Sequence, residues 1–162
     1  MKVYRLAIIS ALLYAPETWW MIQADAQKLE VFQMSCLRSI CGVSLRDHVL
    51  NDNIRQMCCN QFRIEVLTRE NRLRWLGHVL RMNKNKFCNK IWKKSRPNGW
   101  KCTRNAPKKT WDKVIAEDLE PLKRRFGAGR WYREQSTILY ELASDRNEWR
   151  RLIKNIGQAT AV

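Results

Sequence analysis

Apolar residues that recur at helical spacing constrain the fold of this chain more than any other feature. Between residues 61 and 82, Leu73, Leu76, Val79 and Leu80 fall on one stripe of a helix. Such a stripe predicts an amphipathic helix that packs on one side and presents its cations on the other. Only six glycines and four prolines interrupt the 162 residues, and no segment has a convincing strand pattern. The sequence therefore predicts an all-α fold of several amphipathic helices joined by loops.

The N-terminal third contains signals for two longer helices. We expect a buried helix over residues 3–15 that stops near Pro16. Asp25 is a candidate N-cap for the next helix, and Gly42 is its expected C-terminal stop. The expected buried face of that second helix carries Leu29, Phe32, Cys36, Leu37 and Ile40.

Shorter helices are expected in the rest of the chain. One runs from residue 51 to about residue 59, and another runs from residue 110 to near Pro121. Within residues 83–109 we expect at most a short helix over 87–93. Residues 131–156 form either one helix or two helices that meet at Ser144 and Asp145.

Positive charge is concentrated in the central third of the sequence. The formal net charge is +16, and residues 61–109 carry fifteen basic and two acidic side chains. Residues 83–109 hold eight lysines and two arginines with weak periodicity, which predicts a basic and partly flexible loop. The expected organisation is a helical region over 1–82, a basic flexible linker over 83–109 and a C-terminal helical segment over 110–162.

This cationic segment predicts a polyanionic partner, and nucleic acid fits best. Lysine and arginine side chains can neutralise backbone phosphates, and tryptophans can stack on unpaired bases. The candidate phosphate ligands are Arg69, Arg72, Arg74, Arg81, Lys93, Lys94, Arg96, Lys101, Lys108 and Lys109, and the candidate stacking residues are Trp92 and Trp100. An anionic membrane surface is the alternative partner, although the loop after residue 82 has little apolar content to insert.

The sequence disfavours a metal site and a catalytic centre. Its six cysteines and two histidines contain no closely spaced ligand pair such as C-x2-C, so we expect free thiols, a reducing compartment and no metal or other cofactor. No Gly-rich phosphate loop is present, and nothing positions a nucleophile beside a base. The adjacent acids Glu117 and Asp118 are expected on a solvated face.

The N-terminal apolar run resembles a short signal peptide. The run extends from Leu6 to Ala15 behind Lys2 and Arg5, but no clear cleavage site follows it. It is also shorter than the roughly 20 residues that cross a bilayer. We therefore expect no signal peptide, no membrane span and an intracellular location, nuclear or cytoplasmic.

Five segments in order resemble motifs downstream of the polymerase domain in non-LTR (LINE-type) retrotransposon reverse transcriptases. They are Leu12–Trp19, Leu29–Ile40, Arg72–Met82, Pro107–Trp111 and Ala143–Arg150, of which Arg72–Met82 is the most specific. Two departures stand out, because Ala15–Pro16 replaces the usual glycine and the small residue that follows it, and Arg104–Ala106 replaces a common Gly-Arg-Pro form.

The resemblance implies a non-catalytic C-terminal piece of an RNA-directed DNA polymerase. The family's catalytic Ala-Asp-Asp turn does not occur in this sequence, so the chain itself is expected to be no enzyme. Its implied partners are template RNA or target DNA, with no preference between them, and the upstream polymerase domain. The motif tryptophans Trp75, Trp111 and Trp149 are expected to build a structural core. The alternative is a structural or protein-interaction remnant of a degenerate element with no independent activity.

Overall fold

The computed structural model of this chain describes residues 1–19, 21–93, 104, 110–126 and 137–159. Within these ranges every regular element is a helix and none is a strand. The predicted all-α fold is confirmed.

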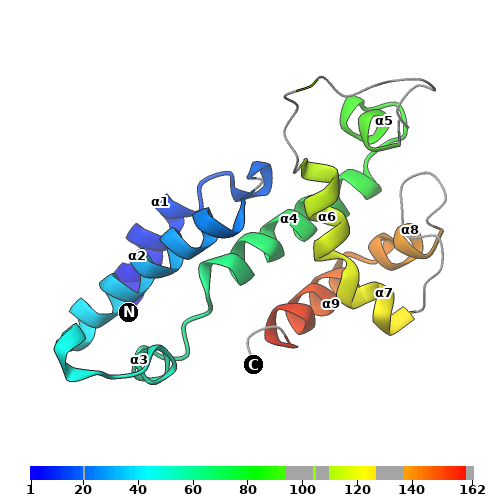
Figure 1. Cartoon of the computed structure of the whole chain (residues 1–162). Coiled ribbons are helices and arrows are strands. Elements are labelled where there is room, and N and C mark those ends of the chain that lie inside the picture. The colour runs from blue at the N-terminus through cyan, green and yellow to red at the C-terminus, as the bar shows by residue number, and fades with distance from the viewer. Residues whose placement is uncertain (20, 94–103, 105–109, 127–136, 160–162) are drawn as a thin grey trace.

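One long helix, α4 (Ile64–Arg81), joins two groups of helices (Figure 1). The N-terminal group contains η1 (Tyr4–Ile9), α1 (Ser10–Leu12), η2 (Pro16–Thr18), α2 (Gln23–Cys41), η3 (Leu45–Asp47) and α3 (Asn51–Met57). The C-terminal group contains α5 (Phe87–Lys93), α6 (Trp111–Asp118), α7 (Glu120–Phe126), α8 (Thr137–Ser144) and α9 (Arg146–Ala159). Both groups pack against α4, so this helix is the central element of the fold.

The larger hydrophobic core is built around α4 and the C-terminal group. The predicted stripe of Leu73, Leu76, Val79 and Leu80 is buried there, as the sequence indicated. Its other members are Trp92, Ile115, Leu119, Leu122, Leu139, Ala143, Trp149, Leu152, Ile153 and Ile156. This core therefore extends across the boundary predicted after residue 82 and joins α4 to helices α5 to α9.

The smaller core lies among η1, α2 and α3. It consists of Tyr4, Met34, Leu37, Ile54 and Cys58. The helix predicted over 3–15 is present as the consecutive elements η1 and α1. Its predicted burial is wrong, since Tyr4 is the only buried residue of that segment. One side of this segment packs on its neighbours, and the other side remains exposed.

The buried face of α2 differs from the predicted one. Leu37 is buried as expected, but Phe32 and Ile40 are about half exposed. Gln33 lies inside instead, because its Nε2 donates a hydrogen bond of 2.8 Å to the carbonyl of Phe62 before α4. The packed face of α2 therefore carries Gln33, Met34 and Leu37, about one position along from the predicted face.

Helix ends follow the sequence signals in part. Gly42 ends α2 with a φ of +67°, a left-handed conformation that favours glycine. The break at Ser144–Asp145 also occurs, because the Asp145 carboxylate accepts hydrogen bonds from the backbone N–H groups of Asn147 and Glu148 and so caps α9. Asp25 is not the N-cap of α2, which begins at Gln23.

Candidate nucleic-acid interface

The joint between α4 and α9 is built on Trp149. Its indole is buried, and Nε1 donates a hydrogen bond of 3.0 Å to the carbonyl oxygen of Leu73. Gly77, one turn later on α4, leaves the space for this ring, since a Cβ at that position would overlap the indole. The glycine and the tryptophan together bring the exposed sides of α4 and α9 close to each other.

A pocket of about 400 Å³ opens at this joint. Its lining consists of Arg74, His78, Arg81, Arg146, Trp149 and Arg150. Helical spacing explains the set, because residues 74, 78 and 81 share one face of α4 and residues 146 and 150 are one turn apart on α9. No acidic side chain is among these lining residues.

We call this cavity the arginine pocket, and Arg81 is the least exposed of its four arginines. Its Nη1 donates a hydrogen bond of 2.7 Å to the carbonyl of Ala143 at the end of α8. Burial lowers the pKa of Arg81 below its ordinary value, and the like charges of Arg146 and Arg150 lower it further. Like charges held together repel one another, so a bound anion would stabilise this arrangement.

An aromatic pair extends the pocket along α4. The rings of Trp75 and His78 lie with their centroids 5.3 Å apart, and Trp75 is 37% exposed. His78 belongs to the pocket lining, so it connects the arginines to the exposed indole. Arg74 forms an ion pair with Glu70 one turn earlier, and this is a weak interaction because Arg74 is largely exposed.

Arg72 is not available to nucleic acid, which corrects its assignment as a phosphate ligand. The side chain is 4% exposed, and Nε and Nη2 donate to the two carboxylate oxygens of Asp118 at 2.7 and 3.0 Å. Arg69 Nε donates to the same carboxylate at 3.2 Å. Asp118 is itself buried, so the prediction that it lies on a solvated face is also wrong. This cluster joins α4 to α6.

The tryptophans are distributed differently from the predictions. Trp92 is 5% exposed and packs edge-on against Trp111, so it cannot stack on a base as proposed from the sequence. Trp149 is in the larger core as expected, and Trp111 is partly buried and packs against that core. Trp75 was expected to build the core, yet it lies at the surface beside His78.

Several predicted ligands lie outside the described residues. These are Lys94, Arg96, Trp100, Lys101, Lys108 and Lys109, and for Lys93 only the backbone, at the end of α5, is described. Of the phosphate ligands predicted from the sequence, Arg74 and Arg81 lie together in the arginine pocket.

Sequence reasoning missed Arg146, Arg150 and His78. Arg146 and Arg150 share a face of α9 with Trp149 and therefore lie beside the buried stripe. That periodicity could have marked them as neighbours of a packed surface. It could not have indicated that the surface facing them belongs to α4.

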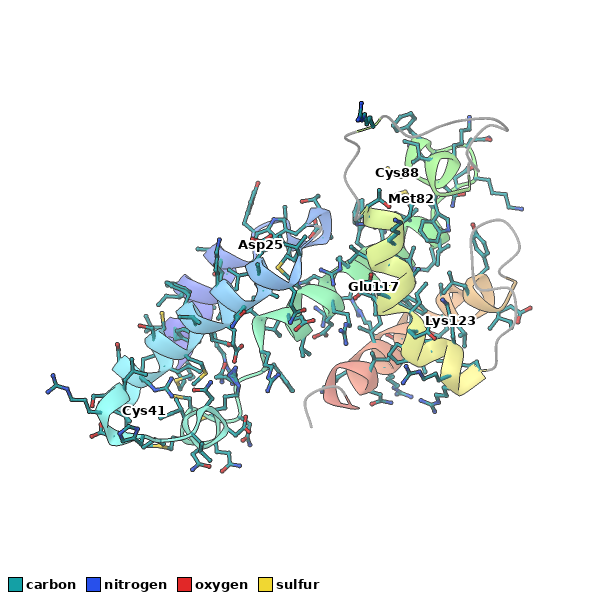
Figure 2. The ribbon with its side chains drawn as sticks, in the orientation of Figure 1. Asp25, Cys41, Met82, Cys88, Glu117 and Lys123 are labelled. Atoms are coloured by element: carbon teal, nitrogen blue, oxygen red, sulfur yellow. The ribbon has the colours of Figure 1, made fainter. Side chains whose placement is uncertain are left out.

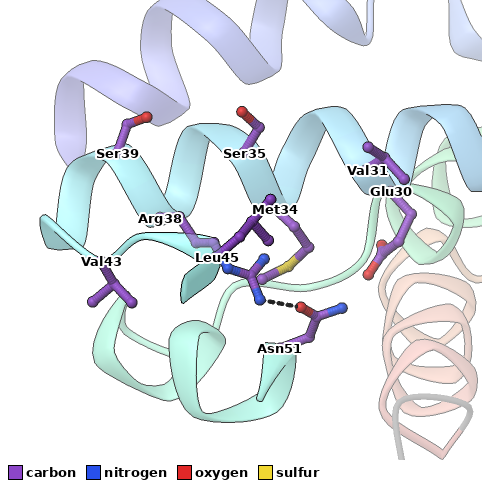
Figure 3. A pocket seen from close by; sticks show the side chains of 9 residues that line it. All are labelled: Glu30, Val31, Met34, Ser35, Arg38, Ser39, Val43, Leu45 and Asn51. Atoms are coloured by element: carbon purple, nitrogen blue, oxygen red, sulfur yellow. Dashed lines mark hydrogen bonds between the residues drawn. The ribbon is translucent and has the colours of Figure 1, made fainter. Parts of the chain in front are cut away.

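Two other cavities lack the features of an anion site. A groove of about 520 Å³ between α2 and the loop that follows it is mainly apolar (Figure 3). Arg38, its only lining cation, donates to the carbonyl of Val49 and to Asn51. A second cavity between α4, α6 and α7 mixes cations with acids, Glu117 and Lys123 being examples that Figure 2 labels.

The cysteines form no metal site in the described part of the chain. The five cysteines within it are free, as predicted, and no group of three or more potential ligands is close enough to hold an ion. Cys41 and Cys58 approach to 3.1 Å between their Sγ atoms, where α2 ends near α3. Burial raises the pKa of the Cys58 thiol to about 11, and the hydrogen bond with Cys41 contributes.

Comparison of the chain with protein families, curated proteins and solved structures finds no match. Among the described helices, none combines the length and the apolar character that crossing a membrane requires. The function is therefore inferred from the residues of the arginine pocket and from the sequence motifs.

Proposed function

We propose that this chain binds nucleic acid through the exposed surface that α4 and α9 share, without catalysing a reaction on it. The observation that carries the proposal is the arginine pocket, in which four arginines from two helices meet without an acidic lining residue. Guanidinium groups bind phosphate oxygens through charge-assisted hydrogen bonds, and a concave cationic site concentrates the field.

The aromatic pair favours an unpaired strand. Base stacking on an exposed ring contributes about 1–3 kcal/mol and depends little on sequence. Trp75 offers such a ring beside the pocket, in place of the buried Trp92. A strand could then place a phosphate among the arginines and a base near Trp75.

The motif resemblance supplies the biological context of the proposal. The pocket residues Arg74, His78 and Arg81 all lie within the segment Arg72–Met82, the most specific of the five motifs. A C-terminal part of a reverse transcriptase that binds template RNA or target DNA inside the cell, next to its polymerase domain, would use these residues.

A purely structural role is the second candidate, and the Arg69–Arg72–Asp118 cluster favours it. This cluster uses Arg69 and the motif residue Arg72 to join α4 to α6, and it leaves Arg72 unexposed. If all cations of the region served such contacts, the chain would bind nucleic acid only weakly.

A matched pair of variants distinguishes the two candidates. Arg150 lines the pocket, whereas the neighbouring Arg151 is exposed on α9 and does not. We expect Arg150→Gln to weaken binding of a single-stranded oligonucleotide about tenfold, the effect of losing one charge-assisted hydrogen bond. Arg151→Gln removes the same charge from the same helix and should change the affinity far less.

The measurement is fluorescence anisotropy with labelled RNA and DNA strands at fixed ionic strength. Equal losses in the two variants would mean that only the total charge matters, and the pocket would not be the binding site. Circular dichroism of both variants checks that α9 stays folded.

A further inference from the structure

We propose that the arginine pocket takes a phosphomonoester, namely the terminal phosphate of a nucleic-acid strand, in preference to a phosphodiester within the strand. The inference rests on the proposed function and specifies the chemical group that the pocket recognises.

The number of cations in the pocket exceeds what one internal phosphate can balance. Arg74, Arg81, Arg146 and Arg150 line a volume of about 400 Å³, and Glu70 beside Arg74 supplies one nearby carboxylate. A phosphodiester carries a single negative charge. A phosphomonoester, whose second ionisation has a pKa of about 6, approaches two charges above neutral pH and offers three acceptor oxygens.

The least exposed arginine of the pocket, Arg81, is held in place before any ligand binds. Arg81 is fixed by its hydrogen bond to the Ala143 carbonyl and is repelled by Arg146 and Arg150. A fixed, partly desolvated cation gains most from an anion with a high charge on few atoms, because weaker solvation strengthens the attraction. A terminal phosphate is esterified to only one sugar. It can therefore reach further into a pocket than an internal phosphate, which has a nucleotide on both sides.

The attraction comes from side chains and not from the end of α9. Asp145 caps this helix, and its carboxylate offsets the positive potential of the N-terminus. Trp149 closes the pocket between the two helices with an apolar ring. His78 lines the pocket and its ring lies beside Trp75, so the base of a terminal nucleotide could stack on this aromatic pair.

The test compares three oligonucleotides of one sequence: with a 5′-phosphate, with a 3′-phosphate, and with hydroxyl groups at both ends. The full chain is titrated with each at pH 7.5 and constant ionic strength, and anisotropy gives the dissociation constants. We expect one phosphorylated strand to bind about tenfold tighter than the hydroxyl strand. The two phosphorylated strands show which end the pocket takes.

The variants Arg146→Gln and Arg151→Gln then locate the effect. Arg146 lines the pocket, so the preference for a phosphorylated end should disappear in Arg146→Gln. Arg151 does not line it, so the preference should persist in Arg151→Gln. If all three strands bind wild-type protein equally and Arg150→Gln weakens all three alike, the preference for terminal phosphate is wrong and the proposed function stands. If none of the strands binds, both proposals fail.

Discussion

Replacing Asp118 by asparagine is expected to lower the free energy of unfolding by about 3–5 kcal/mol, because it removes the carboxylate that neutralises a buried arginine. Asp118 is 3% exposed and accepts hydrogen bonds from both Arg72 and Arg69. Without its charge, Arg72 remains inside the protein as an unpaired cation. Urea unfolding followed by circular dichroism measures the change.

Glu120→Gln is the matched control for this prediction. Glu120 is two residues further along the chain and pairs with Lys123 at 3.2 Å on the surface. An exposed pair contributes little, so the control should change the free energy of unfolding by less than about 1 kcal/mol. Equal effects of the two substitutions would show that the Arg72–Asp118 pair does not hold α6 on α4.

The second large effect is expected for Trp149→Ala, with a loss of about 3–5 kcal/mol in the free energy of unfolding. Trp149 is 1% exposed, and its ring connects α9 to α4 through Leu73 and Gly77. The substitution removes the ring and its hydrogen bond, and it separates Arg146 and Arg150 from the pocket residues of α4. Thermal and urea unfolding both report the loss.

Trp75→Ala provides the comparison, since it removes the same side chain from the surface of α4. Trp75 is 37% exposed and belongs to neither hydrophobic core, so its loss should lower the free energy of unfolding by clearly less than the loss of Trp149. The same variant should weaken single-strand binding, by about 1–3 kcal/mol if a base stacks on the indole. A Trp75→Ala protein as unstable as Trp149→Ala would contradict the assignment of Trp75 to the surface.

Local periodicity predicted the elements whose packing is determined by their own sequence. The apolar stripe of α4 is buried as expected, and the break at Ser144–Asp145 is one of the two alternatives that the sequence left open. In these segments the buried positions repeat regularly, or a short polar residue caps the helix within a few residues. Such signals need no knowledge of distant partners.

Long-range partners decided the features that the sequence did not predict. Arg72 is four residues before Leu76 and therefore on the buried stripe, but its role depends on Asp118, 46 residues away. Trp92 and Trp111 bury each other across a segment that the sequence shows only as basic and turn-rich. The arginine pocket likewise requires α4 and α9 to meet, so only Arg74 and Arg81 could be named in advance as ligands.

The salt dependence of binding tests the central claim most directly, because phosphate contacts release counterions. The logarithm of the association constant for a single strand is plotted against the logarithm of salt concentration, for wild type and for the Arg74→Gln, Arg146→Gln, Arg150→Gln triple variant. We expect a steep negative slope for wild type, reduced by about 0.7 for each pocket arginine removed. A slope near zero, or one that the triple variant leaves unchanged, would contradict phosphate binding in this pocket.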